Sequence, residues 1–175
     1  MLRQMQKRPP DHIDGILAQW RRERPDLDVR PLGVLGRLFR AAHLADTALA
    51  EGLVGHGLQS GWFDLLAALR REGEPYELNP TRLMSATLLS SGGMTKRLDR
   101  LVEAGLVKRR ADPTDRRGTL VRLTRRGKRT IDAALEAHLE NERRLLRPLK
   151  QAERRALDRL LRSLLVELEG GDTAT

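Results

Sequence analysis

The stretch that decides the fold is LLSSGGMTKRLDRLVEAGLVKRRADPTDRRGTLVRLT, residues 88–124. Within it, apolar side chains recur at helical spacing over residues 91–104. The positions in this stripe are Met94, Leu98, Leu101 and Val102. Two β-prone segments, 106–110 and 119–123, then flank a loop that contains the Asp, Pro and Gly of a turn. We therefore predict a turn, a helix that ends at Gly105 and a β-hairpin, in that order.

Charge is concentrated in the same part of the chain. Residues 90–130 hold 13 Lys and Arg against four Asp and Glu, a net charge of +9. The whole chain also has a net charge of +9, so the remainder is neutral. A neutral body with one strongly basic segment is typical of a protein that presents one surface to a polyanion.

The elements predicted upstream complete a recognisable order. Asn79-Pro80 favours the start of a short helix over 80–88, because Asn accepts from first-turn N–H groups and Pro fixes φ. A helix over 61–71, capped by Ser60, precedes it, and residues 76–78 form at most a very short strand. Helix, short helix, turn, helix and hairpin make a winged helix-turn-helix. Its second helix fits the DNA major groove and its hairpin reaches the minor groove or phosphates.

Long apolar stripes flank this region. They predict helices from Pro31 to about residue 53, from Thr124 to about residue 147, and over 151–168. These stripes exceed what one small winged helix can bury, so we expect the helices to pack against a second copy of the chain. The fold class is mainly α with a small β-hairpin wing. The expected regions are an N-terminal arm and short helix (1–30), a helical dimerisation region (31–57 and 125–168), a winged helix-turn-helix DNA-binding domain (58–124) and a disordered tail (169–175).

Composition excludes several classes of protein. The absence of cysteine removes disulfides, thiol catalysis and cysteine redox sensing. No apolar run approaches the roughly 20 residues that span a bilayer, and the N-terminus has no signal-peptide core. We expect a cytoplasmic protein. The four histidines match no metal-ligand spacing, and no nucleophile–base pair or phosphate loop is present. We therefore predict no enzyme activity, no metal and no cofactor.

From about Val34 to Leu168 the sequence resembles the MarR family of bacterial transcriptional regulators. The resemblance rests on SGWFDLLAAL (60–69), NPTRLM (79–84), the whole of 88–124 and LKQAERRALDRLLRSLL (149–165). Met84-Ser85 and Lys150 depart from the family pattern. The resemblance implies an obligate homodimer on a pseudo-palindromic duplex, with half-sites about one helical turn apart. It also implies a small, often aromatic or phenolic, effector.

The resemblance assigns roles in DNA binding. Arg117 at the wing tip would enter the minor groove, Asp115 would hold it by charge-assisted hydrogen bonds, and Arg116 would contact phosphate. The recognition-helix candidates are Ser90, Ser91, Gly92, Thr95, Lys96, Arg97 and Arg100. Alternatives stay open: Ser90 as a simple helix cap, and ion pairs of Arg97 and Arg100 with Glu103 and Asp99. Strand residues Arg109, Arg110 and Arg122 either face DNA or are exposed edge charges.

Candidate residues for an effector site are Trp20, Arg37, His43, Trp62 and Phe63, and the alternative is that they are core or interface residues. The predicted function is a sequence-specific regulator of transcription, acting as a repressor that a small ligand releases from duplex DNA. The competing interpretation is a nonspecific architectural DNA-binding protein. Selectivity between DNA sequences discriminates between them.

Overall fold

The computed structural model describes residues 9–59, 61–87, 93–115 and 118–170. They form two compact units, one up to residue 48 and one from residue 49 onward. The chain is mostly helical, with one small antiparallel sheet. This confirms the predicted fold class.

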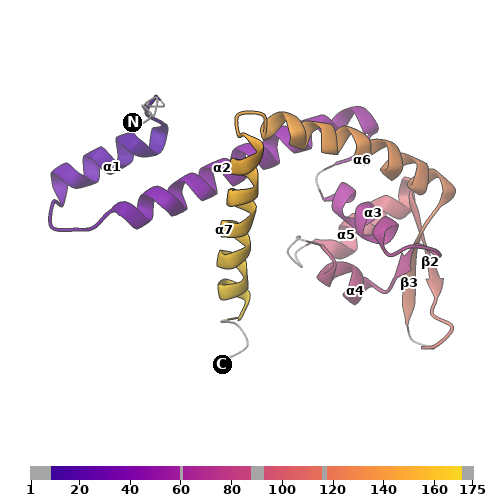
Figure 1. The fold of residues 1–175 in the computed structure, drawn as a ribbon. Helices are drawn as coiled ribbons and strands as arrows, with labels where there is room; N and C mark the ends of the chain where they lie inside the picture. The colour runs from indigo at the N-terminus through magenta and orange to yellow at the C-terminus, as the bar shows by residue number, and fades with distance from the viewer. Residues whose placement is uncertain (1–8, 60, 88–92, 116–117, 171–175) are drawn as a thin grey trace. The chain divides into compact units, whose positions relative to one another are not determined.

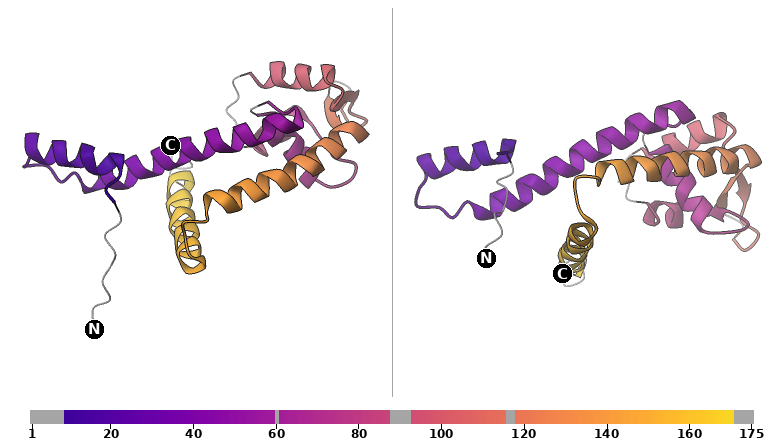
Figure 2. Two further views of the ribbon diagram at one scale, coloured as in Figure 1. Left: turned by 90° about the horizontal axis from the view of Figure 1, so that it is seen from above. Right: turned by 45° about the horizontal axis from the view of Figure 1, so that its top comes forward.

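In the first unit, α1 (His12–Glu23) lies along the start of α2 (Arg30–Leu53), as Figures 1 and 2 show. Asp11 caps α1, and its carboxylate and that of Asp14 form a capping box. The Arg37 guanidinium on α2 lies 2.7 Å from Asp11 Oδ2 and 2.5 Å from Asp14 Oδ1. These ion pairs fasten the start of α1 to α2. The apolar side chains buried in this unit are Ile13, Leu17 and Val29.

The second unit contains the winged helix and the last two helices (Figure 1). Its elements after α2 are η1 (Val54–His56), α3 (Trp62–Arg71), β1 (Glu77–Leu78), α4 (Pro80–Ser85), α5 (Met94–Glu103), β2 (Val107–Ala111), β3 (Thr119–Leu123), α6 (Arg125–Leu145) and α7 (Gln151–Gly170). This is the predicted order. Asn79 caps α4 and Thr124 caps α6, each side chain accepting from a backbone N–H three residues ahead.

The helices on either side of the turn are shorter than predicted. α4 ends at Ser85 rather than near residue 88, because the N–H and hydroxyl of Thr87 both bind the Met84 carbonyl. α5 begins at Met94 rather than at residue 91, because its N-cap is Gly93 with a φ of +79°. A left-handed φ is incompatible with continuing the helix backward and suits glycine.

Two further predictions concern the C-terminal tail and the cap of α3. The expected tail began at residue 169, but α7 runs to Gly170, so residues 169 and 170 are helical. The leucine stripe and the helix-forming Glu169 carry this last turn. Ser60, the expected cap of α3, lies outside the described residues. The N-cap of α3 is Gly61, with a φ of +78°.

The sheet has the strand order β1-β3-β2, and all its pairs are antiparallel. Val107 on β2 lies opposite Leu123 on β3, and both are buried. Glu77 on β1 lies opposite Arg122 on β3. The predicted hairpin is therefore present, and the short segment at residue 77 is a third strand that covers its free edge.

Helix α3 lies at the centre of the core. Its side chains Leu65, Leu66 and Leu69 have no exposed surface. Each such burial is worth about 1.5–3 kcal/mol relative to exposure. The large fully buried side chains around them come from α4, α5, β2, β3 and α6 and are Leu83, Leu101, Val107, Val121 and Ile131. One core thus supports α4, α5 and the wing.

One junction joins the end of α5, both wing strands and the start of α6. The Thr124 N–H donates to the Leu106 carbonyl at 3.0 Å, and the Thr124 hydroxyl donates to the Gly105 carbonyl at 2.8 Å. The same hydroxyl accepts from the Gly127 N–H at 2.9 Å. A Cβ on Gly127 would lie 1.9 Å from the Leu106 carbonyl oxygen, so only glycine fits there.

A charged cluster fastens α3 to α6. Asp132 on α6 accepts from Arg70 Nε at 2.6 Å and from Lys128 Nζ at 2.8 Å. The two cations also lie 5.1 and 5.8 Å from the centre of the Tyr76 ring. Hydrogen bonding to Lys128, with help from Arg70, holds the pKa of Asp132 below its usual range.

Helix α7 turns sharply off the end of α6 (Figure 2). Arg154 Nε donates to the carbonyls of Leu146 and Leu149, each at 3.0 Å, and so caps the end of α6. The Lys150 N–H donates to Glu153 Oε2 at 2.7 Å, which starts α7 without a Ser cap. No α7 side chain is buried within the single chain. No helix in the described ranges is both long and apolar enough to cross a membrane.

Substituting Gly127 by Ala is expected to lower the free energy of unfolding by about 1–3 kcal/mol, because the backbone at Leu106 must move. Urea denaturation followed by circular dichroism measures this change. Gly55→Ala is the control, since a Cβ there meets nothing within 4 Å. Its effect should stay within about 0.5 kcal/mol. Equal stability of Gly127→Ala and wild type would contradict the close packing of Gly127 against the Leu106 carbonyl.

Asp132 should make the free energy of unfolding depend on pH in the acid range. Its folded-state pKa is depressed, so its contribution is present above the unfolded pKa and disappears as pH falls through the folded pKa. Asp132→Asn should cost about 0.5–1 kcal/mol at pH 7, given the partial exposure of the cluster. That difference should shrink toward zero near pH 2 in denaturation series. Glu140→Gln, on the exposed face of α6, is the control. A difference independent of pH would refute the assignment.

Candidate nucleic-acid interface

Helix α5 has two chemically different sides. The side buried in the core consists of Met94, Leu98 and Leu101. The predicted recognition residues that the structure describes are Thr95, Lys96, Arg97 and Arg100. Three of these are exposed, whereas Arg97 is partly buried. The helix therefore offers a polar, cationic surface while its apolar stripe anchors it.

Five of the predicted DNA-binding residues lie outside the described residues. These are Ser90, Ser91, Gly92, Arg116 and Arg117. Gly93 contributes no side-chain cap to α5, and Gly118 closes the other end of the wing loop.

The wing loop is held by its own hydrogen bonds. Asp112 Oδ1 accepts from the Thr114 N–H at 2.8 Å and from the Thr114 hydroxyl at 2.7 Å. These bonds lower the pKa of Asp112. The Gly118 N–H donates to the Asp115 carbonyl at 2.9 Å, and a Cβ on Gly118 would come within 2.9 Å of the Asp112 Cβ. The Asp and Gly of the loop are thus turn-forming residues, with exposed Asp115 at its tip.

Two of the three strand arginines with open roles, Arg109 and Arg110, are in ion pairs, while Arg122 on β3 lies opposite Glu77 and Lys108. Arg109 Nη2 lies 2.8 Å from Asp99 Oδ1 on α5. Arg110 binds Glu77 on β1 with two hydrogen bonds of 2.9 and 2.5 Å. That pairing lowers the pKa of Glu77 and raises that of Arg110. Asp99, one of the two carboxylates considered as a partner for Arg97 and Arg100, pairs with Arg109 of the wing.

Several cations near these pairs make no hydrogen bond or ion pair with another described residue. They are Lys96, Arg100, Lys108, Arg125, Arg126 and Arg129. Lys96 and Arg100 lie on α5 and Lys108 on β2, so the second helix and the wing both carry solvated positive charge. Such charge attracts a polyanion and releases its counterions on binding.

Two residues that position this surface were not singled out by sequence reasoning. Glu77 and Asp99 were seen only as a strand residue and as a helix partner. Arg71 likewise binds the Ala86 carbonyl and so ties the end of α4 to α3. The spacing of four residues between Lys128 and Asp132 does predict their ion pair on α6, which is part of the charged cluster with Arg70. The others depend on contacts between distant elements.

The predicted effector-site residues fall in both units. Trp20, Arg37 and His43 belong to the first unit, where Trp20 and His43 are exposed and Arg37 binds Asp11 and Asp14. Trp62 and Phe63 belong to the second unit and are buried in its core. Of these five residues, Phe63 lines a groove that the structure describes.

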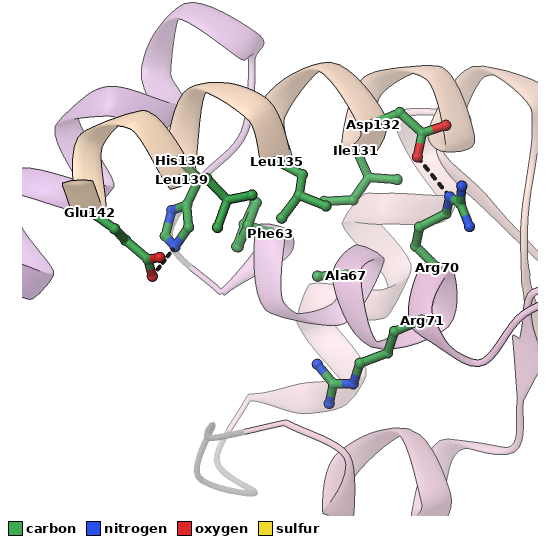
Figure 3. Close-up of a pocket in the computed structure, with 10 residues that line it drawn as sticks. All are labelled: Phe63, Ala67, Arg70, Arg71, Ile131, Asp132, Leu135, His138, Leu139 and Glu142. Atoms are coloured by element: carbon green, nitrogen blue, oxygen red, sulfur yellow. Dashed lines mark hydrogen bonds and ion pairs between the residues drawn. The ribbon is translucent and has the colours of Figure 1, made fainter. Parts of the chain in front are cut away.

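This groove lies between α3 and α6 and has a volume of about 470 Å³ (Figure 3). Its lining residues are Phe63, Ala67, Arg70, Arg71, Ile131, Asp132, Leu135, His138, Leu139 and Glu142. The His138 ring stacks on Phe63 with ring centres 4.3 Å apart, and His138 Nε2 lies 3.3 Å from Glu142 Oε1. His138 Nδ1 is buried and has no hydrogen-bond partner among the described residues. The groove is thus largely apolar, with one unsatisfied nitrogen.

Comparison with known proteins identifies the architecture. The MarR family model matches residues 56–118, from the end of η1 through the wing loop. The HTH-type transcriptional regulator PecS of Dickeya dadantii (strain 3937) is 41% identical over 149 residues. These residues are 85% of this chain and 90% of PecS. The chain belongs to the MarR family of transcriptional regulators.

Solved MarR family structures share the fold. A mutant MarR from E. coli, complexed with operator DNA, is 28% identical with a TM-score of 0.68. The match covers 78% of this chain and 95% of that one. AbsC of Streptomyces coelicolor is 26% identical with a TM-score of 0.71, covering 82% and 97%. This MarR family member is a winged-helix transcriptional regulator, and its relatives are regulators rather than enzymes.

Proposed function

We propose that this MarR family protein binds a pseudo-palindromic operator in duplex DNA as a homodimer and represses transcription. The observation that carries the proposal is the pairing of a cationic α5 surface with a cationic wing on one core. An α-helix fits the major groove, and a wing beside it reaches the adjacent backbone or minor groove. The relative from E. coli complexed with operator DNA supports the same mode.

Each predicted DNA-binding residue has a place in this mode. Ser90, Ser91, Gly92, Thr95, Lys96, Arg97 and Arg100 belong to the recognition helix and the turn before it. We assign Arg117 to the minor groove and Arg116 to a phosphate, with Asp115 holding Arg117 by charge-assisted hydrogen bonds. Base contacts by the helix supply most of the sequence information, while phosphate contacts fix its register.

The homodimer is supported by helix faces that one chain leaves exposed. In α7, Leu160 and Leu168 are 69% and 63% exposed, and no side chain is buried. In α2, Val34 and Phe39 are 68% and 67% exposed. Contiguous exposed apolar faces of this length mark protein interfaces. We assign residues 31–57 and 125–168 to dimerisation and 58–124 to DNA binding, with two-fold symmetry setting the half-site spacing.

Sequencing of the DNA that the purified protein retains from a randomised duplex pool tests this proposal. We expect an enriched pseudo-palindrome with half-sites about 10 bp apart, from the helical repeat of B-DNA. Light scattering should give twice the chain mass of 19.8 kDa. Leu160→Asp and Leu164→Asp together should yield monomers that no longer enrich the sequence. Retention without any enriched sequence would support the architectural alternative, and a monomeric wild type would exclude the dimer.

We also propose that a small phenolic ligand releases the protein from DNA by binding the α3–α6 groove. Aromatic rings of Phe63 and His138 and the aliphatic side chains around them suit a planar ring. A phenol hydroxyl could donate to the unpartnered His138 Nδ1, which otherwise remains unsatisfied among the described residues. The other predicted effector-site residues, Trp20, Arg37, His43 and Trp62, are not among the residues that line this groove. Release would follow from a change in the spacing of the two recognition helices.

Titration calorimetry with phenol and salicylate, alongside DNA competition, measures this response. We expect binding by the wild type and a loss of affinity of about tenfold in His138→Phe, which keeps the ring but removes the acceptor. Glu140→Gln, outside the groove, should bind as the wild type does. Equal binding by His138→Phe would place the ligand elsewhere. Binding that leaves DNA affinity unchanged would remove the regulatory role.

A further inference from the structure

Strand β2 carries two consecutive arginines, and each ends on a carboxylate of a different element. Arg109 Nη2 lies 2.8 Å from Asp99 Oδ1 on α5. Arg110 donates from Nε and Nη2 to the two carboxylate oxygens of Glu77 on β1. One strand is therefore fastened to two other parts of the winged helix by adjacent residues.

The strand register explains why the two side chains diverge. Arg109 lies opposite Val121, whose side chain is fully buried. The Arg109 side chain is therefore on the face of the sheet that packs on the helices. Arg110 lies opposite Leu120, and successive residues of a strand point to opposite faces. Arg110 shares its face with Lys108, Arg122 and Glu77. Its guanidinium therefore reaches across β3 to β1.

Burial of Glu77 shows that the Arg110–Glu77 pair is part of the fold. The Glu77 side chain is only 11% exposed, so its carboxylate needs the bidentate partner that Arg110 provides. The Asp99 and Arg109 side chains are 45% and 41% exposed. A wing of two five-residue strands is marginal alone and needs support from neighbouring elements. Asp99 and Glu77 also offset the repulsion between the cations on β2 and β3.

We propose that Arg109 and Arg110 are positioning residues that set the angle between the wing and helix α5, rather than contacts to DNA. Arg109 fixes the wing directly to the helix, and Arg110 fixes it to the strand that leads into α4. The spacing between major-groove and minor-groove contacts then depends on two ion pairs. This inference rests on the proposed DNA-binding function.

Cations on one strand can have two separate roles. A phosphate contact contributes equally to every DNA sequence and adds about one unit to the salt slope of binding. A positioning residue leaves the salt slope nearly unchanged but alters discrimination where the wing reads DNA. Lys108, which has no ion pair with another described residue, is the matched cation on the same strand.

The experiment uses the full-length protein and the operator recovered from the randomised pool. Variants are Arg109→Ala, Asp99→Ala, the exchange D99R with R109D, and Lys108→Ala as control. Affinity is measured for that operator and for duplexes altered either under the wing or under α5, at several salt concentrations. Hydrogen exchange of the β2–β3 amides is measured without DNA.

We expect Arg109→Ala and Asp99→Ala to lose about two- to fivefold discrimination at wing positions, the range that a partly exposed ion pair supplies. Discrimination under α5 and the salt slope should stay close to wild type, and β2–β3 amides should exchange faster. The double variant D99R with R109D should restore the discrimination at wing positions and the slow exchange of the β2–β3 amides. Arg110→Gln should act like Arg109→Ala, and Lys108→Ala should change the salt slope alone.

Other outcomes overturn the inference. A salt slope lower by about one unit in Arg109→Ala, with equal weakening on all duplexes, would make Arg109 a phosphate contact. Unchanged exchange and unchanged discrimination would show that the pair has no positioning role. If the wild type itself selects no sequence, the proposed function fails. The exchange data then decide separately whether the ion pair holds the wing.

Discussion

The hydrogen bonds that Thr124 makes to the Gly105 and Leu106 carbonyls are the constraint on which the rest of the winged helix depends. They join the end of α5 to the start of α6, and both wing strands lie between these points in the chain. Gly127 lets α6 approach the Leu106 carbonyl, and Gly105 takes the positive φ that turns the chain out of α5. This junction therefore fixes the points at which the two wing strands join α5 and α6.

This junction helps to hold the concentrated positive charge of residues 90–130 in one arrangement. A segment with a net charge of +9 repels itself, and a neutral scaffold must hold it together. The apolar side of α5 and the inner face of the wing share the α3 core, which leaves the cations outside. Ion pairs to Asp99 and Glu77 fix two of these cations, while Lys96, Arg100 and Lys108 stay solvated. Positioning charges and attracting charges are thus different residues of one segment.

Sequence reasoning succeeded where the cause is local. Asn79 and Thr124 cap helices because their side chains bind amides three residues away, and the hairpin follows from alternation around a turn. It failed where the cause is tertiary. The Arg110–Glu77 pair joins residues 33 apart, and the Phe63–His138 stack that lines the groove joins α3 to α6. Helix α5 starts at Met94 rather than at the predicted residue 91 because Gly93 adopts a left-handed conformation, which composition does not specify.

The central claim is that one rigid pairing of helix and wing reads a DNA sequence, beyond the attraction between opposite charges. Charge alone predicts similar affinity for every duplex of equal length, whereas base readout predicts discrimination. The most direct test is the ratio of dissociation constants for the recovered operator and for a scrambled duplex of the same composition, at about 0.15 M salt. The account predicts a ratio on the order of 10³ or more. Equal affinity for the two duplexes would contradict it.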